Sequence, residues 1–150
     1  MAIEYRLTLA GEPALEDVAA RAALDPAEVS QFTPYQQVLD ADLFEKRGYV
    51  ITVAPGRNGY IEAADDTGRW EWEPDSYVDV NFRMNKFQLE LGTPNMVESV
   101  EGILQSGDED AALVQNGDFL LLTRFGGVLR KHNRATWWDH YGYPNEIIPD

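Results

Sequence analysis

The chain has 150 residues, of which 44% are hydrophobic, so it has the size and the apolar content of one folded domain over residues 1–150. Its 26 acidic and 12 basic residues give a formal net charge of -14, a field that repels nucleic acid and anionic membranes and attracts basic proteins. The absence of cysteine excludes disulfides, thiolate zinc sites and a cysteine nucleophile. No apolar stretch predicts a signal peptide or a membrane span, so we expect a cytoplasmic protein.

The first third of the chain predicts one strand and two helices. Residues 4–10 alternate between apolar and polar side chains, which is typical of a strand with one buried face. Apolar residues at helical spacing predict a helix over 14–24, and Asp25 with Pro26 predicts the start of a short second helix, in which Glu28 takes the capping-box position. Residues 33–42 are mostly polar, and we expect them to be irregular.

Residues 15–31 are similar to the helix-turn-helix of a DNA-binding repressor. Such a motif needs donors for base edges and cations for phosphates on its second helix. The second helix offers Glu28, Ser30 and Gln31, and no Lys or Arg lies between Ala22 and Glu45. We therefore predict that these helices pack in the core and that the protein does not bind nucleic acid.

The middle of the chain predicts a meander of three or four antiparallel strands over residues 49–84. Strand-like runs at 49–53, 60–64 and 69–73 are separated by a Pro- and Gly-rich turn at 55–59 and by a hairpin turn at 65–68. The clearest periodic signal follows over residues 77–87, where the apolar residues Val78, Val80, Phe82 and Met84 alternate with polar ones.

The last third predicts a second main helix and a hairpin. Thr93 is placed to cap a helix that runs to Gly107, with Pro94 at its first position. Asn116-Gly117 predicts a tight turn between strands at 111–115 and 119–124, and another strand is expected at 128–131. The predicted fold class is α+β, an antiparallel sheet with two main helices, near 14–24 and 94–106, packed on one face.

The sequence gives little support for a metal site, a cofactor site or a catalytic site. The carboxylates at 108–110 and 65–66 lack the spacing of a calcium loop, so we predict neither a metal nor a cofactor. His132 and His140 are the only histidines, and no serine lies in a nucleophile elbow. We therefore assign no catalytic residue.

Aromatic residues allow two interpretations. Trp70 and Trp72 share one face of a predicted strand and Glu71 and Glu73 share the other, which fits either core tryptophans beneath an acidic rim or a binding surface. A second group near the end of the chain is expected to seal the core as a lid; it contains Trp137, Trp138, Tyr141 and Tyr143.

Three segments carry a resemblance to a known family: "MAIEYRLTLA", "YVDVNFRMNKF" with Arg83 and Lys86, and "GDEDAALVQNGDFLLLTRFGGVLRKH" before "WWDHYGYPNE". In this order they resemble the Sit-type immunity proteins, which protect myxobacteria and related bacteria from lipoprotein toxins passed between neighbouring cells. The resemblance implies a small cytoplasmic domain without catalytic residues that binds and blocks one toxin domain.

The resemblance and the charge together suggest a partner and a surface. We hypothesise that a basic toxin is steered by carboxylates and anchored by aromatics of the middle segment. The predicted toxin-binding residues are Asp65, Asp66, Trp70, Glu71, Trp72, Glu73 and Asp75. The alternatives are a non-catalytic ligand- or peptide-binding module and, less favoured, a small hydrolase-type enzyme.

Overall fold

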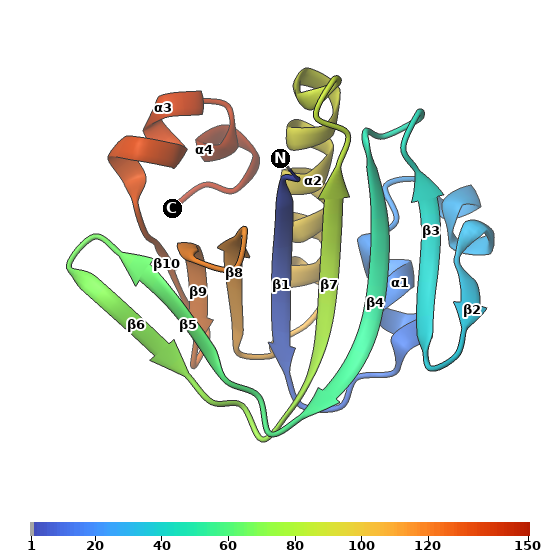
Figure 1. Cartoon of the computed structure of the whole chain (residues 1–150), viewed down its shortest axis with the longest axis horizontal. Coiled ribbons are helices and arrows are strands. Elements are labelled where there is room, and N and C mark those ends of the chain that lie inside the picture. The colour runs from blue at the N-terminus through green and yellow to red at the C-terminus, as the bar shows by residue number, and fades with distance from the viewer. Residues whose placement is uncertain (1) are drawn as a thin grey trace.

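A ten-stranded sheet forms the body of the protein in the computed structural model, which describes residues 2–150 (Figure 1). The strands are β1 (Glu4–Ala10), β2 (Thr33–Tyr35), β3 (Val38–Leu43), β4 (Tyr49–Arg57), β5 (Ile61–Asp65), β6 (Gly68–Trp72), β7 (Ser76–Met84), β8 (Ala111–Gln115), β9 (Phe119–Phe125) and β10 (Val128–Lys131). Their order across the sheet is β2-β3-β4-β7-β1-β8-β9-β5-β6, and β10 also pairs with β9. The helical elements are α1 (Leu15–Ala22), η1 (Pro26–Gln31), α2 (Leu89–Gln105), η2 (Arg134–Trp138), α3 (Asp139–Tyr141) and α4 (Pro144–Ile147).

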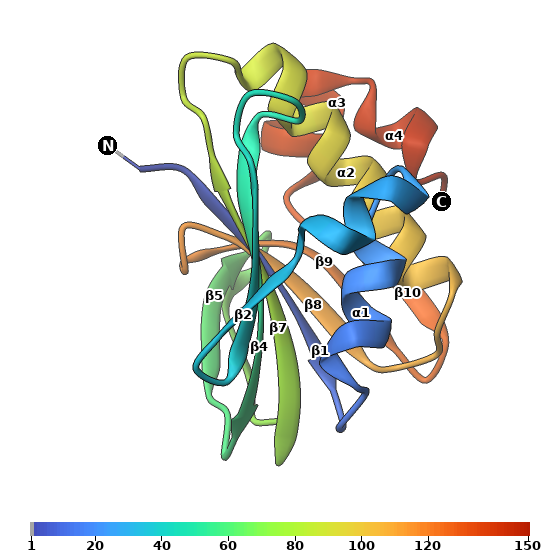
Figure 2. The ribbon, with the colours of Figure 1, turned by 90° about the vertical axis from the view of Figure 1, so that its right-hand side faces the viewer.

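The main core lies between the sheet and the helical elements, which gather on one side of it (Figure 2). β1 runs through the middle of the sheet with antiparallel partners on both sides, so that Leu7 lies between Val80 of β7 and Leu113 of β8. All three side chains are buried, as the alternation in their strands predicts. From the helices, apolar side chains such as Val18 and Val100 complete the core.

The predicted fold class is wrong. The sheet is not purely antiparallel, because β5 meets β9 in parallel at Ala64 and Phe119. It is also larger than predicted, since most of residues 33–42, expected to be irregular, belong to β2 and β3 at the sheet's edge. Most helical elements are short: α2 has 17 residues, but α1 has only eight. The result is a large mixed sheet with short helices rather than an antiparallel sheet with two main helices.

Residues 49–84 form a single bent ribbon instead of the predicted meander. β4 pairs with β7, and β5 pairs with β6, so the hairpin turn at 65–68 is confirmed but the strand order is not. Between the two halves, Asn58 N donates to Asp75 O (2.7 Å) and Gly59 N donates to Pro74 O (2.9 Å). The ribbon bends here, which carries β5 and β6 away from β4 and across to β9.

The bend depends on two glycines beneath an aromatic ring. A Cβ atom on Gly56 would lie 2.2 Å from Cζ of Tyr77, and one on Gly59 would lie 2.9 Å from Cε1 of the same ring. Both distances are shorter than atoms of side chains tolerate, so the ring can lie against the ribbon only because neither residue has a side chain. The Pro- and Gly-rich segment expected to be a turn is therefore a bend within the ribbon.

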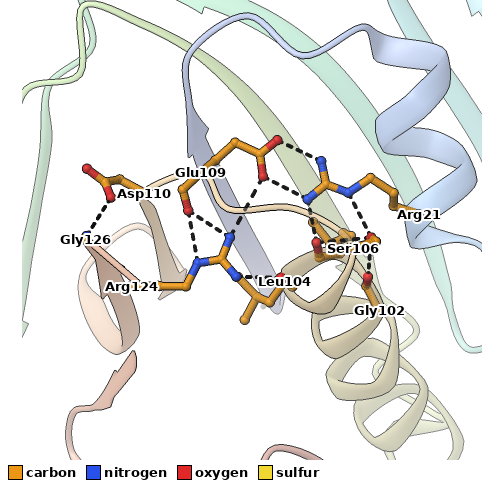
Figure 3. Close-up of polar contacts among 9 residues, drawn as sticks. Arg21, Gly102, Leu104, Ser106, Glu109, Asp110, Arg124 and Gly126 are labelled. Carbon is orange, nitrogen blue, oxygen red and sulfur yellow. Dashed lines mark hydrogen bonds and ion pairs between the residues drawn. The ribbon is translucent and has the colours of Figure 1, made fainter. Parts of the chain in front are cut away.

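Helix α2 begins earlier than predicted and is held at its end by two arginines. It starts at Leu89, so Thr93 and Pro94 lie inside it rather than at its cap. At the other end, Nη2 of Arg21 donates to Ile103 O and Nη1 of Arg124 donates to Leu104 O, both at 2.5 Å (Figure 3). These carbonyl groups have no partner within the helix, so the arginines satisfy them and tie α2 to α1 and β9.

A carboxylate holds the two arginines in place. Glu109 receives a two-pronged ion pair from Arg21, with both N to O distances at 2.8 Å, and its backbone carbonyl accepts from Arg124 at 2.8 and 3.1 Å (Figure 3). All three side chains are largely buried. Because every charge has a partner, this cluster stabilises the junction of helix and sheet.

Candidate functional site

The β5–β6 hairpin, residues 61–72, carries most of the predicted binding residues and packs on the side of the sheet opposite the helices. In β8, Ala111 and Leu113 face the main core, whereas Ala112 and Val114 face away from it. The hairpin covers the latter two with Ala63, and these residues form a second small core together with Leu120. The hairpin is therefore docked on the body and is not a free arm (Figure 1).

Trp70 and Trp72 belong to this second core. Their rings lie 6.4 Å apart, and the Trp72 ring meets the ring of Phe125 of β9 edge-on at 5.2 Å. Both tryptophans are half-buried. Most of their apolar surface therefore holds the hairpin against the sheet, which favours the core interpretation of the sequence over that of free binding anchors.

The predicted carboxylates divide into two groups. Asp65 and Asp66 lie at the hairpin tip, where Asp65 bonds to Thr67 within the turn and Asp66 accepts from the backbone N–H of Asn133, whereas Glu71, Glu73 and Asp75 are exposed along β6 and the bend. Asp65 Oδ1 accepts from the Thr67 backbone N–H at 2.8 Å, and this bond is the main reason that the pKa of Asp65 lies below its usual value. The structure thus leaves three carboxylates of the prediction exposed on one strand and its extension.

A network of paired side chains crosses the hairpin next to these carboxylates. Arg69 forms an ion pair with Glu62 and another with Glu71 at 3.0 Å, and Tyr60 donates to Glu62 at 2.8 Å. These side chains are exposed, so the pairs contribute little to stability. They do hold the side chains of the hairpin's outer face in a fixed arrangement.

Asn133 fastens the hairpin tip, and the sequence analysis did not identify it. Its side-chain Nδ2 donates to Leu120 O (2.7 Å) and to Ala64 O (3.0 Å), and its backbone N–H donates to Asp66. Its backbone is left-handed, with φ at 56°, a conformation that Asn tolerates better than most residues. We call this group of contacts the Asn133 clasp.

His132 lies next to the clasp in a half-buried position. Its Nε2 is 3.0 Å from the Thr123 hydroxyl, and its Nδ1 is 3.9 Å from Asp65. Burial lowers the pKa of His132, and the nearby Asp65 carboxylate opposes that shift. The Thr123 hydroxyl is buried, so the arrangement joins β9, β10 and the hairpin tip rather than presenting a nucleophile to solvent.

A small cavity with both polar and apolar lining separates the hairpin from the central strands. It has a volume of about 100 Å³ and is lined in part by Arg6, Thr8, Tyr60 and Glu62. On its floor, the Thr8 hydroxyl donates to Asp79 Oδ1 at 2.5 Å, and burial raises the pKa of Asp79. The cavity is too small for most metabolites but has room for a side chain or a few waters.

Metal sites, membrane-spanning helices and DNA-binding helices find little support in residues 2–150. No group of three or more His, Asp or Glu side chains in that range is arranged to hold a metal ion. None of its helices is long and apolar enough to cross a membrane. The segment similar to a helix-turn-helix ends in a 3₁₀ helix, in which Glu28 is fully buried. The Glu28 carboxylate forms an ion pair with Arg47 at 2.7 Å and therefore does not close a capping box. That helix therefore serves the core, as predicted.

Comparison with known proteins identifies the class. The segments on which the resemblance was based overlap a match to a family of Sit-type immunity proteins, and the resemblance is confirmed. The matching model is that of the SitI3-like family and covers residues 3–142, so the chain belongs to the SitI3-like family. No curated protein and no solved structure matches the chain.

Proposed function

We propose that the protein is an immunity protein that neutralises one toxin domain by stoichiometric binding in the cytoplasm. Membership of the SitI3-like family is the observation that carries this proposal. The net charge of -14 supports a basic partner, because opposite charges speed encounter and favour correct orientation.

The exposed edge of the hairpin is the surface that we assign to the toxin. Glu71 is exposed on β6, and Glu73 and Asp75 are exposed in the segment that follows it; the hairpin is docked by the tryptophans and fastened by the Asn133 clasp. A surface that is already ordered loses little conformational entropy on binding. The carboxylates can therefore steer a basic toxin, and Glu73 and Asp75 can pair with it without prior rearrangement.

The contacts of the buried and half-buried titratable groups support a binding function rather than a catalytic one. His132 contacts Thr123 and lies near Asp65, and Asp79 accepts from Thr8. These contacts join strands to one another, and the adjoining cavity of about 100 Å³ is smaller than a typical substrate pocket. Stoichiometric blocking of the toxin requires no reaction at these groups.

The experiment that tests the proposal is protection from the toxin. A candidate toxin domain is expressed in a susceptible host with and without this protein, and survivors are counted. We expect survival only on co-expression, together with a one-to-one complex on size-exclusion chromatography. Equal killing in both strains, with no complex, would refute the proposal for that toxin.

A further inference from the structure

Phe87 is the most exposed large hydrophobic side chain in residues 2–150, with 85% of its surface accessible. It lies on the loop between β7 and α2, at the top of the view in Figure 1. Leu91, 40% exposed, follows four residues later on the first turn of α2. An aromatic ring with this exposure contributes almost no buried area to the fold, so packing within the chain does not explain it.

The loop holds Phe87 in a fixed position. Asn85 is largely buried, and its Oδ1 accepts from the Phe87 backbone N–H at 3.1 Å. The Asn85 backbone N–H donates to Gly48 O (2.8 Å), and its carbonyl accepts from Gln88 N–H (3.0 Å). The exposed ring is therefore carried by an ordered turn, as expected of an anchor that meets a partner without first becoming ordered.

Two cations next to Phe87 have no carboxylate partner within residues 2–150. Nine of the twelve Lys and Arg residues form ion pairs within residues 2–150, and those that do not are Arg83, Lys86 and Arg130. Arg83 and Lys86 both line a surface hollow of about 330 Å³ beside Phe87, and Lys86 Nζ lies 5.3 Å from the centre of the ring. In a chain with 26 acidic residues, unpaired cations around an exposed ring mark a site for a carboxylate-bearing partner.

We propose that Phe87 is the apolar anchor of the toxin interface. The ring enters an apolar pocket on the toxin, and carboxylates at the rim of that pocket pair with Arg83 and Lys86. The inference rests on the proposed function, because the occupant is the same toxin. It supplies the anchor that the hairpin lacks, since Trp70 and Trp72 are engaged with Phe125.

The two surfaces make opposite electrostatic demands on the partner. The hairpin carboxylates attract basic groups, whereas Arg83 and Lys86 attract acidic ones. A toxin that satisfies both can dock in one orientation only, which is a source of specificity for the cognate toxin. Phe87 and the two cations therefore determine which toxin is bound, while the net charge governs the rate of encounter.

The test is the affinity of an inactive toxin domain for three proteins: the wild type, the Phe87→Ala variant and the Tyr35→Ala variant. Tyr35 of β2 is a matched control because its ring is also mostly exposed, at 64%. We expect Phe87→Ala to weaken binding at least tenfold and Tyr35→Ala to change it less than twofold, with both variants as stable as the wild type. Lys86→Glu is expected to weaken binding severalfold.

The other outcomes test the anchor role of Phe87, the proposed function and the identity of the occupant separately. If the wild type binds and Phe87→Ala binds within twofold of it, the anchor role is refuted and the proposed function stands. If the wild type does not bind, the proposed function fails and the anchor role fails with it. Self-association, or binding to phosphatidylglycerol vesicles, that is lost in Phe87→Ala while toxin binding is kept would assign the loop to another occupant and overturn the inference.

Discussion

Replacing Asn133 with Ala tests whether the clasp holds the hairpin in place. The substitution removes two side-chain hydrogen bonds, to Leu120 O and Ala64 O, each of which contributes about 0.5–1.5 kcal/mol net. It also places Ala in a left-handed conformation, which costs about 1 kcal/mol more than Asn there. We therefore expect Asn133→Ala to lower the free energy of unfolding by about 2–4 kcal/mol.

The assay is urea denaturation, with hydrogen exchange to locate the change. Asn133→Gly is the matched control, because it removes the same hydrogen bonds but tolerates the left-handed backbone, so it should cost about 1 kcal/mol less than Ala. Exchange should quicken in the amides of β5 and β6 but not in those of β1 and β7. A loss below about 0.5 kcal/mol in Asn133→Ala, or uniform quickening across the sheet, would contradict the role of the clasp.

Three further substitutions test the fold and its pH dependence. Gly56→Ala should destabilise the protein by about 1–3 kcal/mol, because the new Cβ atom displaces the Tyr77 ring. Most of that cost should vanish in a Tyr77→Ala background, and an equal cost in the wild-type and Tyr77→Ala backgrounds would show that the ring is not responsible. Arg124→Met should cost about 3–5 kcal/mol because it leaves the Leu104 carbonyl at the end of α2 and the Glu109 carbonyl without their donor. Arg57→Met, whose ion pair is exposed, should cost less than about 0.5 kcal/mol, and similar losses in the two variants would contradict the buried role. The folded-state pKa of His132 lies below its unfolded value of about 6.5, so its contribution to stability is complete above that pH and is lost as the pH falls below it. Wild type should therefore lose stability relative to His132→Gln as the pH falls below about 6.5, and parallel pH profiles of the two proteins would refute this.

Local patterns in the sequence predicted individual elements well. β1 spans the predicted residues Glu4–Ala10, and α1 and β8 lie where periodicity placed them. Asn116 and Gly117 both adopt positive φ values in the turn before β9, as their residue types indicate. These features depend on neighbours a few residues apart, and the sequence reports such neighbours directly.

Pairing between distant segments could not be predicted in the same way. β4 and β7 pair across a separation that includes β5 and β6, and a bend at Gly56 and Gly59 decides that pairing. The same glycines also read as an ordinary turn, which produced the meander prediction. Strands β2 and β3 were missed because pairing between distant segments, of β3 with β4 and of β2 with β3, makes them strands rather than their own residue preferences.

The candidate site was predicted in part. The exposed positions of Glu71 and Glu73 fit the acidic rim expected from the alternation over residues 69–73. Asn133 was missed because its three contacts come from segments 13 to 69 residues away, and an isolated Asn carries no sign of them. Phe87 was expected to end a strand, and only the structure shows that its ring faces solvent.

The binding claim is tested most directly by the rate at which an inactive toxin domain associates with two charge variants. One variant carries Glu71→Gln, Glu73→Gln and Asp75→Asn on the hairpin. The other removes the same charge from exposed positions on the helices, with Glu16→Gln, Asp17→Asn and Glu98→Gln. At low salt we expect the hairpin variant to associate at least tenfold more slowly and the helix variant within about twofold of wild type. Equal rates for the two variants would contradict a toxin-binding role for the hairpin.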